Sequence, residues 1–371
     1  MMSDVCRSVR NLGQLSLAVL VSGLMLSGTA AAKGFGNDPW DDPASYFFPG
    51  YDTNHDGHLD RKEWNRRGNF ERMDTNRNGT IEVEELRVLY RDWGKKGKMT
   101  NPILPQDPPV MDAGYEKDKI DYKEMGRRSI CGLVQRGVKR VAKCTKAAEM
   151  SAELGLIETG VGPVFPAKAF CHSIDETFAL DYADKTGKGK HGGIDLPTDY
   201  GTPMLAVAAG TIVAKFDPDI NARGKTVVLR HSPEDTGLPF WIYTEYAHMD
   251  ELPKQEVGQR VRMGEVLGPT GNTGVSMKQV GKDVKRRPGI HFAVYYSESR
   301  RFTEVPNYII PEKGKWMDST ALYRKTGPYD SQALRALPDA QKDIPVPVMY
   351  LDGGVEPAGT KVIWPYACKR E

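Results

Sequence analysis

The chain has 371 residues, with 51 lysines and arginines against 49 aspartates and glutamates, so its formal net charge is only +2. This balance gives no reason to expect a nucleic-acid partner, which favours a strongly basic surface. The length is enough for two or three domains of about 100 to 200 residues each.

The first residues are typical of a cleavable export signal. Arg7 and Arg10 precede an apolar run over 15–26, and small residues ending at Ala32 follow it. That run is shorter than the roughly 20 residues that a membrane span needs, so an uncleaved anchor is the weaker alternative. We expect residues 1–32 to be removed as a signal peptide, leaving no stable membrane span. The mature protein is then exported, to the periplasm or as a secreted protein.

A pattern of oxygen-bearing side chains follows, and it occurs twice. The first copy spans 52–63 and the second spans 74–85, each with glycine at its sixth position and glutamate at its twelfth. This is the spacing of an EF-hand loop, in which Ca²⁺ collects several oxygens and the glycine permits a sharp turn. The expected calcium ligands are Asp52, Asn54, Asp56, His58, Asp60 and Glu63 in the first loop and Asp74, Asn76, Asn78, Thr80, Glu82 and Glu85 in the second.

We assign residues 33–97 to this EF-hand pair, with short helices around 64–73 and 84–93. Leu59 and Ile81 both stand at loop position 8, where paired loops form a short two-stranded contact. The alternative of two polar turns without metal would have to produce the full ligand spacing twice by chance. A third acidic stretch, 112–124, has its spacing one residue out and is expected to be a degenerate copy or a surface turn.

Residues 98–160 are expected to form a linker followed by a basic helical segment. Lysine, glycine and proline dominate 94–109, a composition typical of linkers. From 123 to 156 the sequence becomes helical and basic. Such a run of charge is usually a solvated face, and contact with acidic polymers is the alternative.

Four cysteines remain after residue 32, and in an exported protein they could form two disulfides by any of three connectivities. They are Cys131, Cys144, Cys171 and Cys368. If the first two lie in one continuous helix, they are about 20 Å apart and cannot pair with each other. In that case a long-range bridge from Cys368 to the core is favoured.

Short β-branched runs alternate with glycine, proline and aspartate turns from 164 to 294, which predicts a mostly antiparallel β domain. Within it, His191 and Asp195 are separated by a segment that contains two glycines. A straight strand would hold them roughly 13 Å apart, so a bend is needed to bring imidazole and carboxylate to zinc bond lengths of about 2 Å. His291 would be the third ligand, which leaves the fourth position for water, as in catalytic zinc sites. The alternative is two structural histidines and an aspartate that caps a turn.

Taken together, these segments resemble the lysostaphin-type zinc endopeptidases, which cut peptide cross-links in bacterial cell walls. The resemblance extends from about Pro163 to about Val294. It includes the His-x-x-x-Asp pair, the run 199–213, Thr226 to His231, Tyr246-Ala247-His248, 257–261, and the Gly-x-Thr-Gly-x-Thr-Gly segment at 268–274. The resemblance implies zinc bound by His191, Asp195 and His291, His248 as a catalytic histidine, and peptidoglycan or its peptide stems as the substrate.

One departure from the family pattern bears on mechanism. The family usually closes its motif series with His-x-His, whose first histidine is catalytic, but here that position is Gly289. Losing an acid–base partner can cost about 10²- to 10⁴-fold in rate. His172, His231 and Glu245 are possible replacements, and the sequence assigns none of them the role. A basic insertion over 276–287 is expected to flank the cleft.

The sequence therefore predicts an α+β multidomain protein, with a small helical EF-hand pair and a mostly antiparallel β catalytic domain over 161–310. A proline-rich extension, 311–371, is expected to pack over that domain as a strap. The favoured function is a calcium-binding zinc metalloendopeptidase that hydrolyses peptidoglycan cross-links with a zinc-activated water and His248. A non-catalytic member that binds wall material or activates another hydrolase is the main alternative, and Gly289 supports it. A calcium-regulated interaction module, with the β domain as a scaffold, is the third.

Overall fold

The computed structural model describes residues 44, 48–49, 51–64, 70–90, 108–136, 138–172, 174–184, 187–218, 221–274 and 287–370. The expected signal peptide, most of the linker at 94–109 and the insertion up to residue 286 lie outside these residues. The chain divides into two compact units, 1–36 and 37–371, and all the elements below belong to the second. Among the described residues, no helix combines the length and the apolar character that crossing a membrane requires.

The two calcium loops pair as the sequence predicts. Their flanking helices are α2 (Arg61–Trp64), α3 (Phe70–Met73) and α4 (Val83–Tyr90). Leu59 and Ile81 form an antiparallel bridge in which each backbone N–H donates to the opposite carbonyl, at 2.8 and 2.9 Å. Both side chains are fully buried in a small apolar core that also contains Trp64 and Leu86. The pair therefore has a hydrophobic core of its own.

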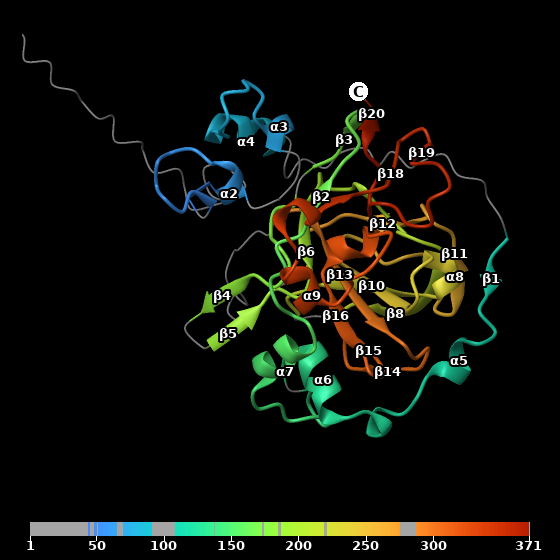
Figure 1. Cartoon of the computed structure of the whole chain (residues 1–371). Coiled ribbons are helices and arrows are strands. Elements are labelled where there is room, and N and C mark those ends of the chain that lie inside the picture. The colour runs from blue at the N-terminus through green and yellow to red at the C-terminus, as the bar shows by residue number, and fades with distance from the viewer. Residues whose placement is uncertain are drawn as a thin grey trace, which may run out of the picture. The chain divides into compact units, whose positions relative to one another are not determined.

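An antiparallel sheet of eight strands forms the centre of the β domain (Figure 1). Its strands are β1 (Val110–Met111), β6 (Ile194–Pro197), β8 (Gly210–Phe216), β9 (Lys225–His231), β10 (Trp241–Met249), β11 (Gln259–Val261), β13 (Gly289–Ser297) and β16 (Lys315–Met317). They follow the order β1-β11-β8-β9-β10-β13-β16, and β6 also pairs with β13. The predicted antiparallel β domain is thus confirmed.

The central strands are buried on both faces. Almost every residue of β9, β10 and β13 is buried, and their sequences are rich in valine, isoleucine and aromatic residues. A strand that is covered on both sides has no reason to alternate apolar with polar residues. β10 and β13 pair along nearly their whole length, with Ala247 opposite His291. This register places His248 and His291 at the same end of two adjacent strands.

Shorter strand pairs and helices surround the sheet. The pairs are β7 (Pro203–Leu205) with β12 (Val266–Pro269), β14 (Phe302–Val305) with β15 (Tyr308–Pro311), β4 (Asp181–Asp184) with β5 (Gly187–Lys190), β17 (Asp343–Pro345) with β2 (Gly162–Val164), β18 (Val348–Met349) with β19 (Val355–Glu356), and β20 (Lys369–Arg370) with β3 (Ala169–Phe170). The helices are α8 (Pro233–Thr236), η2 (Ser319–Tyr323), α9 (Ser331–Arg335) and η3 (Asp339–Gln341). Because β16, β17 and β20 all pair with earlier strands, the carboxy-terminal extension packs on the β domain, as predicted.

The disulfides correct one prediction and confirm another. α6 (Arg127–Val134) and α7 (Ala147–Glu153) are separate helices, so the premise of one continuous helix is wrong. The chain leaves α6 through Gln135, whose left-handed backbone (φ 60°) turns it back on itself. Cys131 and Cys144 are therefore only 5.5 Å apart at Cα and form a disulfide. The second disulfide is the expected long-range bridge, and it joins Cys368 to Cys171.

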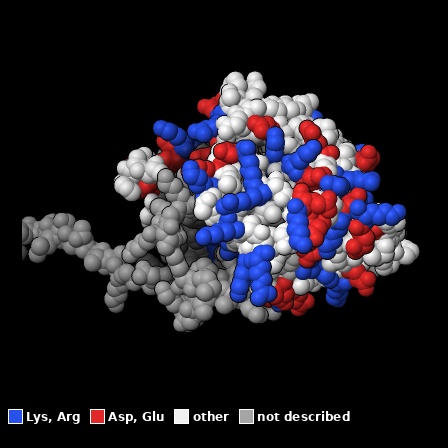
Figure 2. Space-filling model, turned by 90° about the horizontal axis from the view of Figure 1, so that it is seen from below, with Lys and Arg blue, Asp and Glu red and all other residues white. Residues whose placement is uncertain are grey.

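The basic segment forms a mixed surface. Figure 2 views the side on which α6 and α7 lie in Figure 1, and lysine and arginine side chains are spread over it with acidic side chains among them. Arg128 pairs with Glu153 at 2.7 Å and Lys146 with Glu149 at 3.3 Å, and all four side chains are more than half exposed. Exposed pairs of this kind contribute about 0–1 kcal/mol. These contacts favour the interpretation as a solvated face.

The acidic stretch at 112–124 has a structural role. It contains α5 (Tyr115–Asp118) and η1 (Tyr122–Glu124). Asp112 and Asp118 accept hydrogen bonds from Arg230, at 3.2 and 2.8 Å, and the Arg230 side chain is only 2% exposed. A buried guanidinium needs carboxylate partners because an unpaired charge is costly to bury. These two acids therefore neutralise a buried cation on β9.

Candidate metal centre

Three side chains from two distant parts of the sequence meet beside the central sheet. Asp195 on β6 lies directly opposite His291 on β13, and His191 precedes β6. His191 Nε2 is 3.1 Å from Asp195 Oδ1 and 3.0 Å from His291 Nδ1, and the last two atoms are 2.8 Å apart. All three residues are buried. The structure thus brings together the three residues that the sequence singled out.

This triangle fits a zinc ion. Two imidazole nitrogens and a carboxylate oxygen are donors that zinc prefers, and bonds of about 2.0–2.2 Å in a tetrahedral arrangement hold neighbouring ligand atoms roughly 3.3 Å apart. The three atoms lie slightly closer than that and within reach of one ion. Three protein ligands would leave one coordination position open.

The two glycines allow the close approach that the centre needs. A Cβ at Gly193 would lie 2.7 Å from the Phe292 carbonyl oxygen and 3.0 Å from two atoms of the His291 ring. A Cβ at Gly192 would lie 2.5 Å from the Trp316 ring. Any larger residue would therefore push β6 away from β13.

A hydrogen bond from the other ring nitrogen fixes the orientation of the His191 ring. Its Nδ1 lies 3.1 Å from the Thr177 carbonyl oxygen. A carbonyl can only accept, so Nδ1 carries the proton and Nε2 is the nitrogen that faces Asp195 and His291. A hydrogen bond from the nitrogen that does not face the metal sets the tautomer of a metal-binding histidine.

Burial and the neighbouring charges set the proton affinities of the triangle in opposite directions. Burial opposes a charge on His191, but the Asp195 carboxylate outweighs it and raises the pKa of His191. Burial also opposes a charge on Asp195, and the His191 charge nevertheless holds the pKa of that carboxyl well below its usual range. For His291 burial dominates and lowers the pKa to about 4. Without a metal ion, the proton is therefore held on His191, and a metal must displace it.

His248 sits next to this triangle in a strained conformation. Its backbone is left-handed (φ 65°), and its N–H donates to the Arg223 carbonyl at 2.9 Å. Its Nδ1 is 2.9 Å from the Thr273 carbonyl oxygen, and its ring centroid is 5.8 Å from that of His291. A non-glycine residue in this region costs about 1–3 kcal/mol, and such strain is often found at functional sites. The Thr273 contact puts the proton on Nδ1, so Nε2 is the nitrogen that can accept one.

The backbone of the paired strand β6 occupies the space beside Gly289, the position where the family carries its other catalytic histidine. A Cβ at Gly289 would lie 2.9 Å from the Leu196 carbonyl oxygen, on the paired strand β6. That atom belongs to the backbone of a paired strand, so it cannot move aside easily. This strand pairing therefore leaves no ordinary space for a side chain at position 289.

None of the three replacements considered from the sequence joins the triangle. His231 contacts the Ala209 carbonyl at 2.7 Å and the Thr244 hydroxyl at 2.8 Å. Glu245 pairs with Arg223 at 2.8 Å. His172 contacts the Phe170 ring edge-on and lies tilted beside Tyr366, and burial lowers its pKa to about 4. Each of them is held by groups outside the triangle.

A carboxylate that the sequence did not single out lies nearer. Glu176 Oε2 is 4.0 Å from His191 Nε2, and Glu176 Oε1 is 3.3 Å from the Arg287 guanidinium. The same guanidinium pairs with Asp175 and is 3.9 Å from Asp195 Oδ2. No motif marks Glu176, because only strand pairing brings it here. Arg287 ends the basic insertion that was expected to flank the cleft.

The calcium loops hold their acidic side chains in matching positions. Glu63 Oε1 accepts the Thr53 and Asn54 N–H groups, at 2.9 and 3.1 Å, and Asp52 accepts the N–H of Gly57 at 3.0 Å. The carboxylates of Asp52, Asp56 and Glu63 lie within reach of one ion. In the second loop, the corresponding glutamate and aspartate make the same contacts, at 2.7, 3.1 and 2.8 Å. Both loops thus have the geometry that their spacing predicts.

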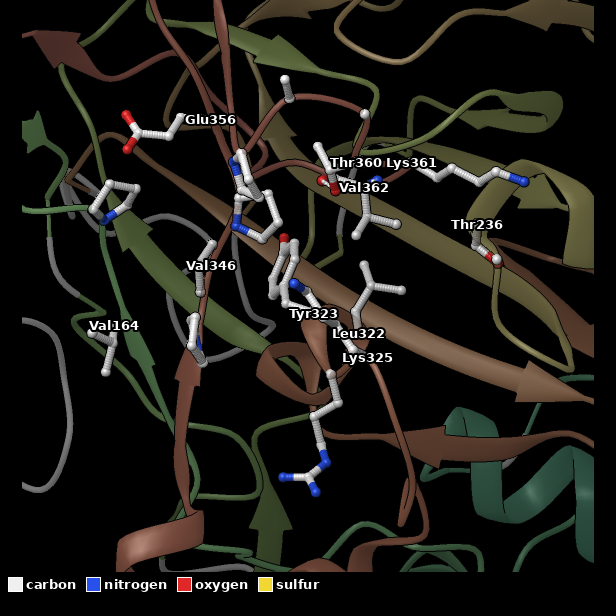
Figure 3. Close-up of a pocket in the computed structure, with 18 of the residues that line it drawn as sticks. Val164, Thr236, Leu322, Tyr323, Lys325, Val346, Glu356, Thr360, Lys361 and Val362 are labelled. Carbon is white, nitrogen blue, oxygen red and sulfur yellow. Dashed lines mark hydrogen bonds between the residues drawn. The ribbon is translucent and has the colours of Figure 1, made fainter.

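The carboxy-terminal extension also helps to enclose a separate cavity of about 620 Å³. Figure 3 shows Tyr323 at its centre, with Val346, Leu322 and Val362 around it and Lys325 nearby. The candidate zinc ligands do not line this cavity. It is therefore a feature of the extension and separate from the metal centre.

Comparison with known proteins agrees with this geometry. A family model described as peptidase family M23 matches residues 189–302, and an EF-hand model matches 51–66 and 70–90. A curated relative, an uncharacterized metalloprotease of Haemophilus influenzae, is 36% identical over 86 residues, which are 23% of this chain and 16% of the relative. The chain thus matches about a sixth of that relative's length.

Two solved structures are also similar over part of the chain. The catalytic domain of the antimicrobial peptidase lysostaphin from Staphylococcus simulans is 23% identical, over 35% of this chain and 84% of that chain, with a TM-score of 0.27. A zinc-containing peptidase from Vibrio cholerae is 22% identical, over 37% of this chain and 36% of that chain, with a TM-score of 0.27. From the family-model matches we conclude that the chain carries a peptidase family M23 domain preceded by a pair of EF hands.

Proposed function

We propose that this protein is an exported, calcium-binding zinc metalloendopeptidase that hydrolyses peptide bonds in peptidoglycan cross-links. The observation that carries the proposal is the triangle of His191 Nε2, Asp195 Oδ1 and His291 Nδ1, whose sides measure 2.8 to 3.1 Å inside a peptidase family M23 domain. Peptidoglycan as the substrate follows from the family resemblance. Export follows from the signal-like residues 1–32.

The residues in and around the triangle would have different roles in hydrolysis. When bound, zinc would polarise the scissile carbonyl and lower the pKa of its water to about 7. His191, Asp195 and His291 would hold it, and the Thr177 carbonyl keeps the His191 ring in the binding tautomer. His248 would stabilise or relay charge through Nε2, because its Nδ1 is engaged by Thr273.

A second candidate is a non-catalytic protein that keeps the fold and binds wall material or activates another hydrolase. One observation favours it. Position 289 is a glycine with the Leu196 carbonyl oxygen close beside it, so the side chain that the family uses in catalysis is missing. An open metal position favours the enzyme instead, since a pure binding module has little use for one.

The two functions are separated by a cleavage assay on the mature protein, residues 33–371. Purified wall fragments are incubated with it, and new amino termini are labelled and counted. We expect zinc-dependent product with the wild type, and a loss after chelation or in His248→Ala. Glu298→Gln is the control, because Glu298 is exposed and belongs neither to the metal centre nor to the calcium loops. No zinc-dependent product at any calcium concentration would reject the peptidase.

A further inference from the structure

We propose that Glu176 is the proton acceptor that replaces the histidine missing at position 289, and that Arg287 positions its carboxylate. This inference rests on the proposed function, since it assigns a catalytic residue to the same centre. It concerns a glutamate outside every motif that the sequence displays.

Strand pairing places Glu176 in line with two candidate zinc ligands. Asp195 is bridged to Glu176 on one side and paired with His291 on the other, and both pairings are antiparallel. The Asp195 N–H donates to the Glu176 carbonyl at 2.9 Å. Residues directly opposite each other in antiparallel pairs project on the same face, with Cβ atoms about 4.5–5.5 Å apart. Glu176, Asp195 and His291 therefore form a row across three adjacent segments, on the face that carries the centre.

The Glu176 carboxylate lies just outside the triangle of candidate ligands. Its Oε2 is 4.0 Å from His191 Nε2, whereas the three ligand atoms are 2.8 to 3.1 Å from one another. That distance is longer than the roughly 3.3 Å expected between ligands of one zinc ion. From this position Oε2 would be placed to accept a hydrogen bond from a water held beside the triangle. Glu176 is thus placed as a base beside the centre.

Glu176 is also more accessible than the ligands. Its side chain is 25% exposed, against 8% for His191 and 7% for Asp195. A group that exchanges protons with a water and a substrate must face the side from which they enter. The buried ligands and the partly exposed glutamate satisfy these two different requirements.

Arg287 holds this carboxylate in place. Its guanidinium is 3.3 Å from Glu176 Oε1, pairs with Asp175 and lies 3.9 Å from Asp195 Oδ2. Arg287 is largely buried, so these charge pairs are poorly screened by solvent. Holding Oε1 fixes the rotation of the carboxylate and keeps Oε2 on the His191 side. Arg287 is therefore a positioning residue rather than a catalytic one.

The proposal also accounts for the loss at position 289. Because the Leu196 carbonyl oxygen would be 2.9 Å from a Cβ there, β13 cannot supply a base at that point. β6 lies between β13 and the segment that carries Glu176. That segment supplies a base from the opposite edge of β6. The same three-segment pairing thus excludes one base and introduces another.

The proton balance of the step is complete with water as the only co-reactant. One O–H bond of the water breaks as its oxygen bonds to the scissile carbonyl carbon, and Glu176 Oε2 takes the proton. The carbon–nitrogen bond then breaks, and Glu176 gives that proton to the leaving nitrogen. The carboxylate is restored, and the products are an acid and an amine.

The first test replaces the carboxylate by an amide of the same shape. We expect Glu176→Gln to lower kcat by about 10²- to 10⁴-fold with a smaller change in KM, as for the loss of a general base. Zinc affinity, measured by competition with a chelator, should stay within about threefold of the wild type. Glu298→Gln is the matched control, because Glu298 is exposed and lies outside the metal centre. For Arg287, kcat should fall in Arg287→Ala and recover in part in Arg287→Lys, with zinc retained in both.

A second measurement does not depend on finding a substrate. Acetohydroxamic acid loses a proton when it binds zinc, and a nearby carboxylate that takes this proton can donate it in a charge-assisted hydrogen bond to the bound hydroxamate. Calorimetric titration of the zinc-loaded protein should therefore show at least about tenfold weaker binding in Glu176→Gln than in the wild type or Glu298→Gln.

The outcomes separate this inference from the proposed function. If the wild type cleaves wall peptides and Glu176→Gln cleaves them equally well, the inference is wrong and the peptidase stands. If Glu176→Gln loses zinc together with activity, Glu176 is a ligand and the inference is also overturned. If the wild type cleaves nothing, the peptidase falls, and the hydroxamate titration alone decides whether Glu176 faces the open position.

Discussion

Replacing Gly193 by alanine tests whether the approach of β6 to β13 builds the metal centre. The added Cβ would stand 2.7 Å from the Phe292 carbonyl oxygen, about 0.7 Å inside an ordinary contact of 3.4 Å. Phe292 is fully buried and paired with both β10 and β6, so neither side can yield freely. The strands must separate by several tenths of an ångström. Asp195 and His291, which face each other across this pair, would separate with them.

A zinc site tolerates little of this movement. Ligand distances in working sites stay within about 0.2 Å of their ideal values, and disturbing the groups that orient ligands typically costs 10- to 100-fold in affinity. We therefore expect Gly193→Ala to bind zinc about 10- to 100-fold more weakly in chelator competition. The strain itself should lower the free energy of unfolding of the metal-free protein by about 1–3 kcal/mol, as overpacking does.

The control for this variant is Gly126→Ala. Gly126 has a φ of −63°, which suits any residue, and no atom lies within 4 Å of a Cβ placed there. That variant should match the wild type in both zinc affinity and thermal unfolding. If Gly193→Ala binds zinc as tightly as the control, the close approach of the strands is irrelevant to the centre.

Three further predictions concern the histidines and the calcium loops. His248→Ala should keep wild-type zinc affinity but lose about 10²- to 10⁴-fold in cleavage rate, and a parallel loss of zinc would show that His248 is a ligand. The pKa of His191 is raised, and its proton must leave before zinc binds. Zinc affinity should therefore be constant at high pH and fall by up to about tenfold per pH unit below that pKa. Chelator competition from pH 5 to 8 that finds no change in zinc affinity contradicts this prediction. Glu63→Gln and Glu85→Gln should remove most of the calcium-binding heat in titration calorimetry, and unchanged heat in the double variant would overturn the assignment of the loops.

Features that depend on contiguous residues could be predicted from the sequence alone. The calcium loops are recognisable because all their ligands fall within 12 positions, and loop geometry then follows from the spacing and from Gly57. The antiparallel β domain follows from short β-branched runs between turns. His191 and Asp195 are identifiable because two glycines between them permit a bend, and His291 because the surrounding segments resemble a family in order.

Features that depend on which segments lie side by side became visible only in the folded chain. Two left-handed residues, Gln135 and Arg140, lie in the turn through which Cys131 meets Cys144, and no composition predicts that turn. Glu176 enters the centre because it lies beside Asp195 on one edge of β6 while His291 occupies the other. Strand register fixes such neighbours, and a shift of one residue would send every side chain to the opposite face. Register arises from the packing of the whole sheet, so it cannot be read from the residues around any one position.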